Sequence, residues 1–204
     1  MLYWRSTSPR NEPVATPTTF FKKAVPYVWN RLPLFCDILI FMQEYVSEGV
    51  VLDHTANGDL DGRVSIFTRR FGKLVAKSKS TKKITSKLAP HLQPGNVIRA
   101  RFVEKGGLQV VDALKERRLS VPPPMLHLLH MLLADAEPDY DLWRVVTSER
   151  FSWPHILRIL GWDPEGAACL SCGTVPVAFH LKSQDFFCAA CASNFGADEV
   201  LLME

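Results

Sequence analysis

Two closely spaced pairs of cysteines constrain the fold of this chain more than any other feature. Cys169 and Cys172 form one C-x-x-C pair, and after fifteen intervening residues Cys188 and Cys191 form a second. A tetrahedral Zn²⁺ ion needs four thiolates that converge on one point, and each tight C-x-x-C turn offers two of them. The spacing lies within the range of known zinc sites. Gly173 follows the first pair, as a knuckle turn requires.

This pattern predicts one structural Zn²⁺ ion held by all four cysteines. Four protein ligands leave no open coordination position, so the ion is expected to stabilise a segment too short to bury its own core. The alternative is a set of reduced cysteines or a redox dithiol, but a redox pair usually begins a helix beside a βαβ unit, which is not indicated here. The fifth cysteine, Cys36, stands apart. An intracellular metal site explains the five cysteines better than a disulfide framework does.

The charge of the chain is distributed unevenly, although the net charge is only +3. From Arg63 to Arg118 there are fifteen basic and three acidic residues, whereas from Leu119 to the end there are four basic and eleven acidic residues. A basic half followed by an acidic half predicts a polyanionic partner for the first half. The alternative is an ordinary solvated surface of lysine and arginine.

The basic half has the pattern of a small β-barrel. Short segments with alternating or β-branched residues, separated by turn signals, predict five strands. They span residues 45–53, 63–68, 71–77, 97–103 and 108–114. Between the third and fourth strands, Ile84 and Leu88 lie four apart, which predicts a short helix over residues 81–88. Five strands in this order indicate a barrel of the OB (oligonucleotide/oligosaccharide-binding) type over residues 42–120.

The acidic half, residues 121–204, has helical patterns and carries the zinc site at 169–191. Three consecutive prolines at 122–124 form a stiff spacer, and helices are expected over 125–134, from Pro138, and after a Ser152 cap, with Gly161 as a stop. The chain is therefore expected to be an α+β protein: an N-terminal OB barrel, then a helical domain with an inserted four-cysteine site. Residues 1–41 hold five prolines and are expected to be irregular. They are either an arm or a stretch that precedes the real start at Met42.

The barrel supplies the candidate binding residues. Phosphates need cations spaced along a groove, and bases need aromatic side chains on which to stack. The predicted nucleic-acid contacts are Arg63, Arg69, Arg70, Lys73, Lys77, Lys79, Lys82, Lys83, Arg99 and Arg101. Phe67 and Phe71 are available for stacking, whereas Phe102 is assigned to the barrel core. Lys87, Lys105 and Lys115 are at least as well explained as solvated side chains.

Several classes of protein are disfavoured. The apolar run at 32–42 contains Pro33 and Asp37 and is too short to span a membrane, and no cleavage site for a signal peptide follows. The loop from Asp53 to Asp61 resembles a calcium loop but has Val64 where a glutamate is needed. His127 and His130 lack zinc-protease spacing and are expected to pack or face solvent. With no phosphate loop or nucleophile motif present, we expect a cytoplasmic protein that is not an enzyme.

The order of four motifs resembles the RecO family of DNA repair proteins. They are Glu48-Gly-Val-Val-Leu52, then Ile66-Phe-Thr-Arg-Arg-Phe-Gly-Lys-Leu74, then Ile156-Leu-Arg-Ile-Leu-Gly-Trp-Asp-Pro164 leading to the first cysteine pair, and Phe187-Cys188 at the second. The resemblance covers residues 42–191. Family members usually continue with more helices beyond the second cysteine pair, and the proline-rich start has no counterpart in the family.

The resemblance implies binding of single- and double-stranded DNA and annealing of complementary strands. It also implies replacement of single-strand-binding protein by RecA, together with the partner RecR, in the bacterial cytoplasm at the nucleoid. From the residues alone, two other classes stay open: an RNA-binding module that joins an OB fold to a zinc ribbon, and a protein-interaction scaffold built on the acidic half. A zinc hydrolase is the least favoured, because all four metal positions are filled by protein.

Overall fold

The structure is a computed structural model that describes residues 43–56, 61–81, 83 and 85–203, all within the unit Ile40–Glu204. Several predictions concern parts of the chain outside these residues: the proline-rich segment 1–41 with Cys36, the start at Met42, residue Lys82 and the loop at 57–60. All five predicted strands are confirmed. They are β1 (Gln43–Ala56), β2 (Gly62–Thr68), β3 (Gly72–Ser78), β4 (Asn96–Glu104) and β5 (Leu108–Arg118).

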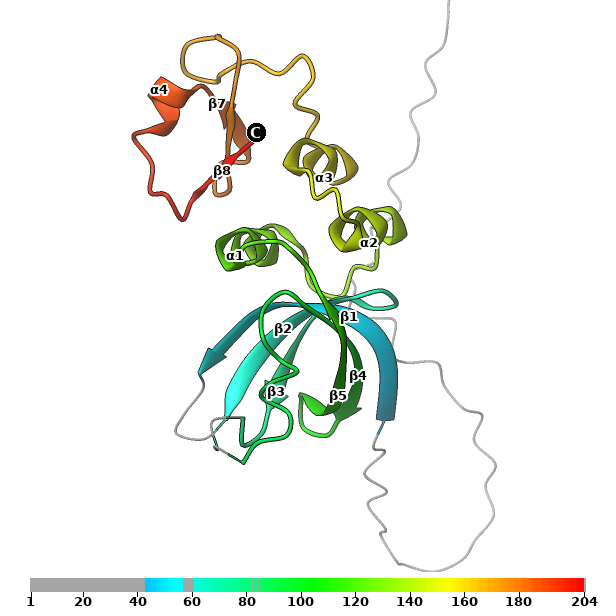
Figure 1. Cartoon of the computed structure of the whole chain (residues 1–204). Helices are drawn as coiled ribbons and strands as arrows, with labels where there is room; N and C mark the ends of the chain where they lie inside the picture. The colour runs from blue at the N-terminus through cyan, green and yellow to red at the C-terminus, as the bar shows by residue number, and fades with distance from the viewer. Residues whose placement is uncertain (1–42, 57–60, 82, 84, 204) are drawn as a thin grey trace, which may run out of the picture. The chain divides into compact units, whose positions relative to one another are not determined.

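These strands close into a barrel in the order β1-β2-β3-β5-β4, with β4 returning to β1 (Figure 1). Four of the five pairings are antiparallel, and β3 pairs with β5 in parallel through Lys77 and Ser78, opposite Gln109 and Val110. A small five-stranded barrel with this Greek-key path is the architecture expected of an OB fold.

The barrel interior is built by the period-two alternation of its strands. On β4, Ile98, Ala100 and Phe102 are fully buried and pack with residues of the other strands, while Arg99 and Arg101 point to solvent. Successive side chains of a strand face opposite sides of the sheet. The residues between the buried apolar ones therefore point away from the barrel interior. The assignment of Phe102 to the core is confirmed.

The helix predicted at 81–88 is absent from the described residues, which form turns and bends between β3 and β4. This connection is fixed by contacts with the barrel instead. Leu92 is fully buried in the barrel core, and the Asn96 side-chain amide donates hydrogen bonds of 3.1 Å to the carbonyls of Pro90 and His91. The burial of Leu92 and the hydrogen bonds of Asn96 thus stabilise this connection in place of the helix that the four-residue spacing predicted.

Three helices follow the barrel, near the positions predicted: α1 (Pro123–Leu132), α2 (Tyr140–Thr147) and α3 (Trp153–Ile159). The Asp139 carboxylate caps α2 by accepting a 2.8 Å hydrogen bond from the backbone N–H of Leu142. Ser152 occupies the N-cap position of α3 as predicted, but its side chain makes no capping hydrogen bond. Gly161 has φ +96° just beyond the end of α3, a conformation that favours glycine.

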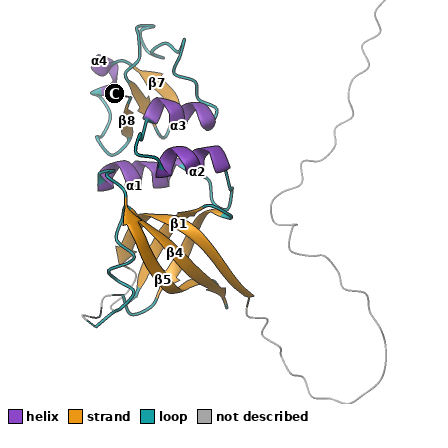
Figure 2. Cartoon of the chain, turned by 45° about the vertical axis from the view of Figure 1, so that its right-hand side comes forward, coloured by secondary structure: helices purple, strands orange, loops and turns teal. Residues whose placement is uncertain are grey.

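The helices share a core with the outer face of the barrel (Figure 2). Val50 and Leu52 of β1 and Phe67 of β2 point away from the barrel interior and pack with Leu126 and Leu129 of α1. The Phe67 ring also lies 5.9 Å from the ring of Trp143 in α2. The outer face of β1 and β2 is thus a second apolar surface, which α1 and α2 remove from water.

The C-terminal part contains a small sheet that the sequence analysis did not predict. Its strands are β6 (Ala178–His180), β7 (Asp185–Phe187) and β8 (Val200–Leu202), in the order β7-β6-β8, and the short helix α4 (Ala189–Ala192) follows β7. Strands of three residues are too short to show the two-residue alternation by which a strand is recognised in a sequence. In the part of the chain that the structure describes, no helix combines the length and the apolar character needed to cross a membrane.

We predict that Gly72→Ala destabilises the protein through the contact between the barrel and the loop after α1. Gly72 has φ +68°, and a Cβ atom there would lie 2.3 Å from the backbone carbonyl of Glu137. Strain and overpacking together are expected to lower the free energy of unfolding by about 2–4 kcal/mol, which urea denaturation would measure. Gly106→Ala is the matched control, because its φ of +62° imposes the same strain but nothing lies within 4 Å. Equal losses in the two variants would contradict the steric explanation.

Candidate nucleic-acid interface and metal centre

A basic groove crosses the outer surface of the barrel at the end where β4 turns into β5. Its lining includes Lys79, Arg101, Lys105 and Gln109, and it continues along the connection between β3 and β4 past Lys83 and Lys87. We define the lysine groove by its five basic side chains. They are Lys79, Lys83, Lys87, Arg101 and Lys105. Among its described lining residues the only acid is Glu44, which pairs with Arg101 at 3.6 Å.

The topology of the barrel explains why these cations gather. The parallel pairing of β3 with β5 brings the residue after β3, Lys79, close to the start of β5, where it lines the same groove as Gln109 and Val111. The turn between β4 and β5 carries Lys105 and uses Gly106 and Gly107, both at positive φ, to reverse the chain. The alternation of β4 turns Arg101 outward toward the same groove.

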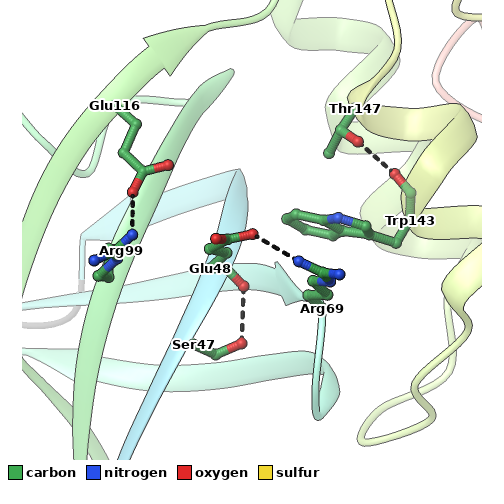
Figure 3. Close-up of polar contacts among 7 residues, drawn as sticks. All are labelled: Ser47, Glu48, Arg69, Arg99, Glu116, Trp143 and Thr147. Atoms are coloured by element: carbon green, nitrogen blue, oxygen red, sulfur yellow. Dashed lines mark hydrogen bonds and ion pairs between the residues drawn. The ribbon is translucent and has the colours of Figure 1, made fainter.

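A second groove lies beside the first on the same outer surface. It is lined by Val46, Ser47, Glu48, Arg69, Arg70 and Arg99, and we call it the arginine groove. Figure 3 shows that two of its arginines face carboxylates: Arg69 lies 3.5 Å from Glu48, and Arg99 lies 3.2 Å from Glu116. The Arg69 guanidinium also lies over the ring of Tyr140 at the start of α2, 5.4 Å from its centroid.

The predicted cations do not all reach these grooves. Six of the predicted contacts line one groove or the other and are exposed. They are Arg69, Arg70, Lys79, Lys83, Arg99 and Arg101. Arg63 and Lys77 are exposed and face each other across β2 and β3, but line neither groove. Lys87 and Lys105, which were at least as well explained as solvated side chains, are groove residues. For Lys105, the Gly-Gly turn beside it was the signal that could have indicated this.

Lys73 is excluded from the candidate interface because it is buried under the helices. Only 8% of the residue is exposed, and its Nζ lies 3.0 Å from Asp135 Oδ1 and donates a 2.9 Å hydrogen bond to the carbonyl of His130. His130 lies 2.8 Å from the Ser65 hydroxyl through its Nδ1 atom. Burial, and then the charge of Lys73, lower the pKa of His130. These histidine contacts are packing contacts, as expected.

The same packing covers part of the barrel face that OB folds commonly use for ligands. That face lies on β2 and β3, where Ser65, Phe67 and Lys73 are buried against the helical region. Phe67 is therefore unavailable for stacking, and Phe71 is half-buried with its ring edge-on to Tyr45 at 5.5 Å. The grooves that remain lie around β4, where the exposed apolar side chains are aliphatic.

The four cysteines of the C-terminal part converge on one point. Their Sγ atoms all lie within 4.8 Å of one another, with Cys172 Sγ 3.6 Å from Cys188 and 3.8 Å from Cys191. A tetrahedral site with Zn–S bonds of about 2.3 Å has sulfur–sulfur edges of about 3.8 Å. The two knuckle turns create this geometry: Gly173, at φ +73°, donates from its N–H to the Cys169 carbonyl at 2.8 Å.

The electrostatics of the cluster favour a bound cation. The backbone N–H of Cys191, followed by the Thr174 and Cys172 side chains, lowers the pKa of Cys188 to about 6. Hydrogen bonds to Cys188 and Cys172 raise the pKa of Cys191 to about 12. Cys188 thus forms a thiolate readily, whereas Cys191 keeps its proton. A bound cation would replace that proton. Four soft sulfur donors in tetrahedral reach of one point fit a metal ion such as zinc.

The barrel and its exposed basic grooves define an OB-fold protein with a surface suited to polyanions. The family described as "Recombination protein O N terminal" matches residues 42–117, which begin one residue before β1 and end within β5. The barrel is therefore similar to the N-terminal domain of the RecO family, a family of recombinational repair proteins. No curated protein matches the chain.

We predict that Lys73→Met lowers stability but leaves nucleic-acid affinity unchanged. Methionine keeps the length of the side chain but removes the charged group that donates a hydrogen bond to the His130 carbonyl. The free energy of unfolding should therefore fall by about 1–2 kcal/mol. Lys77→Met, on the same strand but exposed, should change it by less than about 0.5 kcal/mol. Urea denaturation and oligonucleotide titration of both variants would measure this. A large loss of affinity in Lys73→Met without a loss of stability would contradict the structural role.

Proposed function

We propose that this protein binds single- and double-stranded DNA through the lysine groove and anneals complementary strands. We further propose that it assists the loading of the recombinase RecA in place of single-strand-binding protein, in concert with RecR. The observation that carries the proposal is the concentration of five cations from separate segments in one open groove with a single carboxylate. Such a groove suits a chain of phosphates much better than a neutral or acidic ligand.

The mechanism requires no covalent chemistry. Lysine and arginine side chains replace the counterions of each strand, and the release of those counterions drives binding without regard to sequence. Two strands whose phosphates are neutralised no longer repel each other, so complementary bases can meet. Exposed aliphatic side chains around β4, such as Val111 and Leu114, offer contact to bases without the strong hold of aromatic stacking. We therefore propose a binding and annealing protein, not an enzyme.

A third open groove supports this function less well. It lies between α2 and α3 and is lined by Arg144 and Arg150 but also by Asp141 and Glu149. Mixed charges of this kind provide no net attraction for a polyanion. This contrast makes the α2–α3 groove a useful internal control.

We predict that the triple charge reversal of Lys79, Lys83 and Lys105 to Glu weakens binding to single strands of every sequence by about 100-fold or more. Fluorescence anisotropy with labelled oligonucleotides between about 50 and 200 mM salt would measure it. The logarithmic salt slope should fall by about 0.7 for each phosphate that the variant no longer neutralises. Arg144→Glu in the α2–α3 groove is the control and should have little effect. Unchanged affinity in the triple variant would refute the lysine groove as the DNA surface.

We also propose that the four-cysteine cluster holds one structural Zn²⁺ ion. We predict that the purified protein contains about one zinc per chain, measured by elemental mass spectrometry, and that Cys172→Ser with Cys191→Ser removes it and lowers the melting temperature. Cys36→Ser should leave the metal content unchanged. Substitution by Co²⁺ provides a second measurement, because a tetrahedral thiolate site gives a characteristic visible spectrum. Protein that is stably folded without metal, and unaffected by chelators, would contradict the proposal.

A further inference from the structure

The two basic grooves differ in how their cations are paired. In the arginine groove Arg69 and Arg99 each face a carboxylate, Glu48 at 3.5 Å and Glu116 at 3.2 Å (Figure 3). In the lysine groove, by contrast, no carboxylate of the described residues lies within ion-pair distance of any of the four lysines. The first groove therefore offers two arginines that are already partly neutralised. In the second, Arg101 pairs with Glu44 at 3.6 Å, but its four lysines have no such partner among the described residues.

The grooves are joined across β4. Arg101 lines the lysine groove and Arg99 lines the arginine groove, and the two residues are two apart on one strand with the same outward face. At a rise of about 3.3 Å per residue their Cα atoms lie about 7 Å apart. Val46, which lies opposite Arg101 on β1 and lines the arginine groove, is exposed. A single extended polyanion can thus contact both grooves without leaving the surface.

The carboxylates of the arginine groove are placed where they can be displaced. The side chains of Arg99 and Glu116 are 61% and 36% exposed, and those of Arg69 and Glu48 are 46% and 37% exposed. Exposed ion pairs of this kind are weak, because water and salt screen them and holding two long side chains together costs entropy. A phosphate can replace the carboxylate at either arginine, but the displaced carboxylate stays nearby and repels it.

We propose that a single strand bound in the lysine groove continues across β4 into the arginine groove, where Glu48 and Glu116 compete with its phosphates for Arg69 and Arg99. The inference rests on the proposed DNA binding and adds to it a second subsite with a built-in competitor. The strand is held firmly at the lysine end and exchangeably at the arginine end. The arginine end lies beside α2, because Arg69 also lies over the Tyr140 ring.

The test combines oligonucleotide length with removal of the competing charges. Oligothymidylates of roughly 6 and roughly 16 nucleotides span the range of site sizes known for OB folds, and the shorter should fill only the lysine groove. In the Glu48→Gln, Glu116→Gln double variant, affinity for the long strand should rise about 5-fold or more. Its logarithmic salt slope should steepen by about 0.7 for each additional phosphate that the arginines neutralise. Affinity for the short strand should change by less than about 2-fold.

Glu165→Gln is the control for removal of a single paired carboxylate elsewhere on the surface. It removes one negative charge and releases Arg158 from an exposed ion pair, but in the loop after α3, away from both grooves. It should leave both affinities unchanged. The converse variant, Arg69→Gln with Arg99→Gln, should weaken the long strand only. Melting curves should match the wild type, since all these side chains are at least partly exposed.

The outcomes separate this inference from the proposed function. A gain of equal size for both lengths would mean that the glutamates act only through overall charge, and would overturn the second subsite. The absence of any gain for the long strand would overturn it as well, while leaving the lysine groove in place. If the wild-type protein bound neither length, the proposed DNA binding would fail and the subsite with it.

Discussion

The packing of α1 and the loop after it against β1, β2 and β3 determines which surface the barrel can offer to a ligand. The apolar part of this contact consists of Val50, Leu52 and Phe67, which pack against the helices. Beside them, Lys73 forms an ion pair with Asp135 and donates a hydrogen bond to the His130 carbonyl. Because this contact occupies part of the usual ligand face of an OB fold, the cations that remain available in grooves lie around β4 and its neighbouring loops. The location of the grooves is thus a consequence of how the second half of the chain covers the first.

On the proposed function, the protein must release strands as well as bring them together, and the charge pattern around β4 is suited to that requirement. If every cation on the surface were unpaired, each additional phosphate would add to affinity and the annealed product would be held as tightly as its precursors. Carboxylates beside Arg69, Arg99 and Arg101 reduce the gain at these positions. On the proposed function, these carboxylates lower the affinity for phosphates near the arginines, where a strand is exchanged. The affinity of the lysines for phosphates is not lowered.

Local patterns predicted the parts of the molecule that depend on neighbouring residues. The alternation of β4 assigned Phe102 to the core and Arg99 and Arg101 to the surface, and the cysteine spacing indicated the cluster. The burial of Lys73 was beyond such reasoning, because its partner Asp135 lies far along the chain, in the loop after α1. The pairing of Arg99 with Glu116 likewise depends on the register of β4 against β5. The sequence shows which residues are cationic. Whether each of them is free to bind a phosphate depends on contacts with residues far away in the chain.

The C-terminal sheet links the cysteine cluster to the rest of the molecule through one strand. On β6, Ala178 packs with Cys169 and Phe187 in the small core beside the cluster, while its neighbour Phe179 points to the opposite side and joins the helical core. The Phe179 ring lies 5.2 Å from that of Trp162, and Leu201 of β8, which pairs with Phe179, belongs to the same core. Because β6 has only three residues, its pairing with β7 and β8 is marginal without support on both faces. A metal ion at the cysteines would support one face and the helices the other, so loss of the metal should loosen the helical core as well as the knuckles.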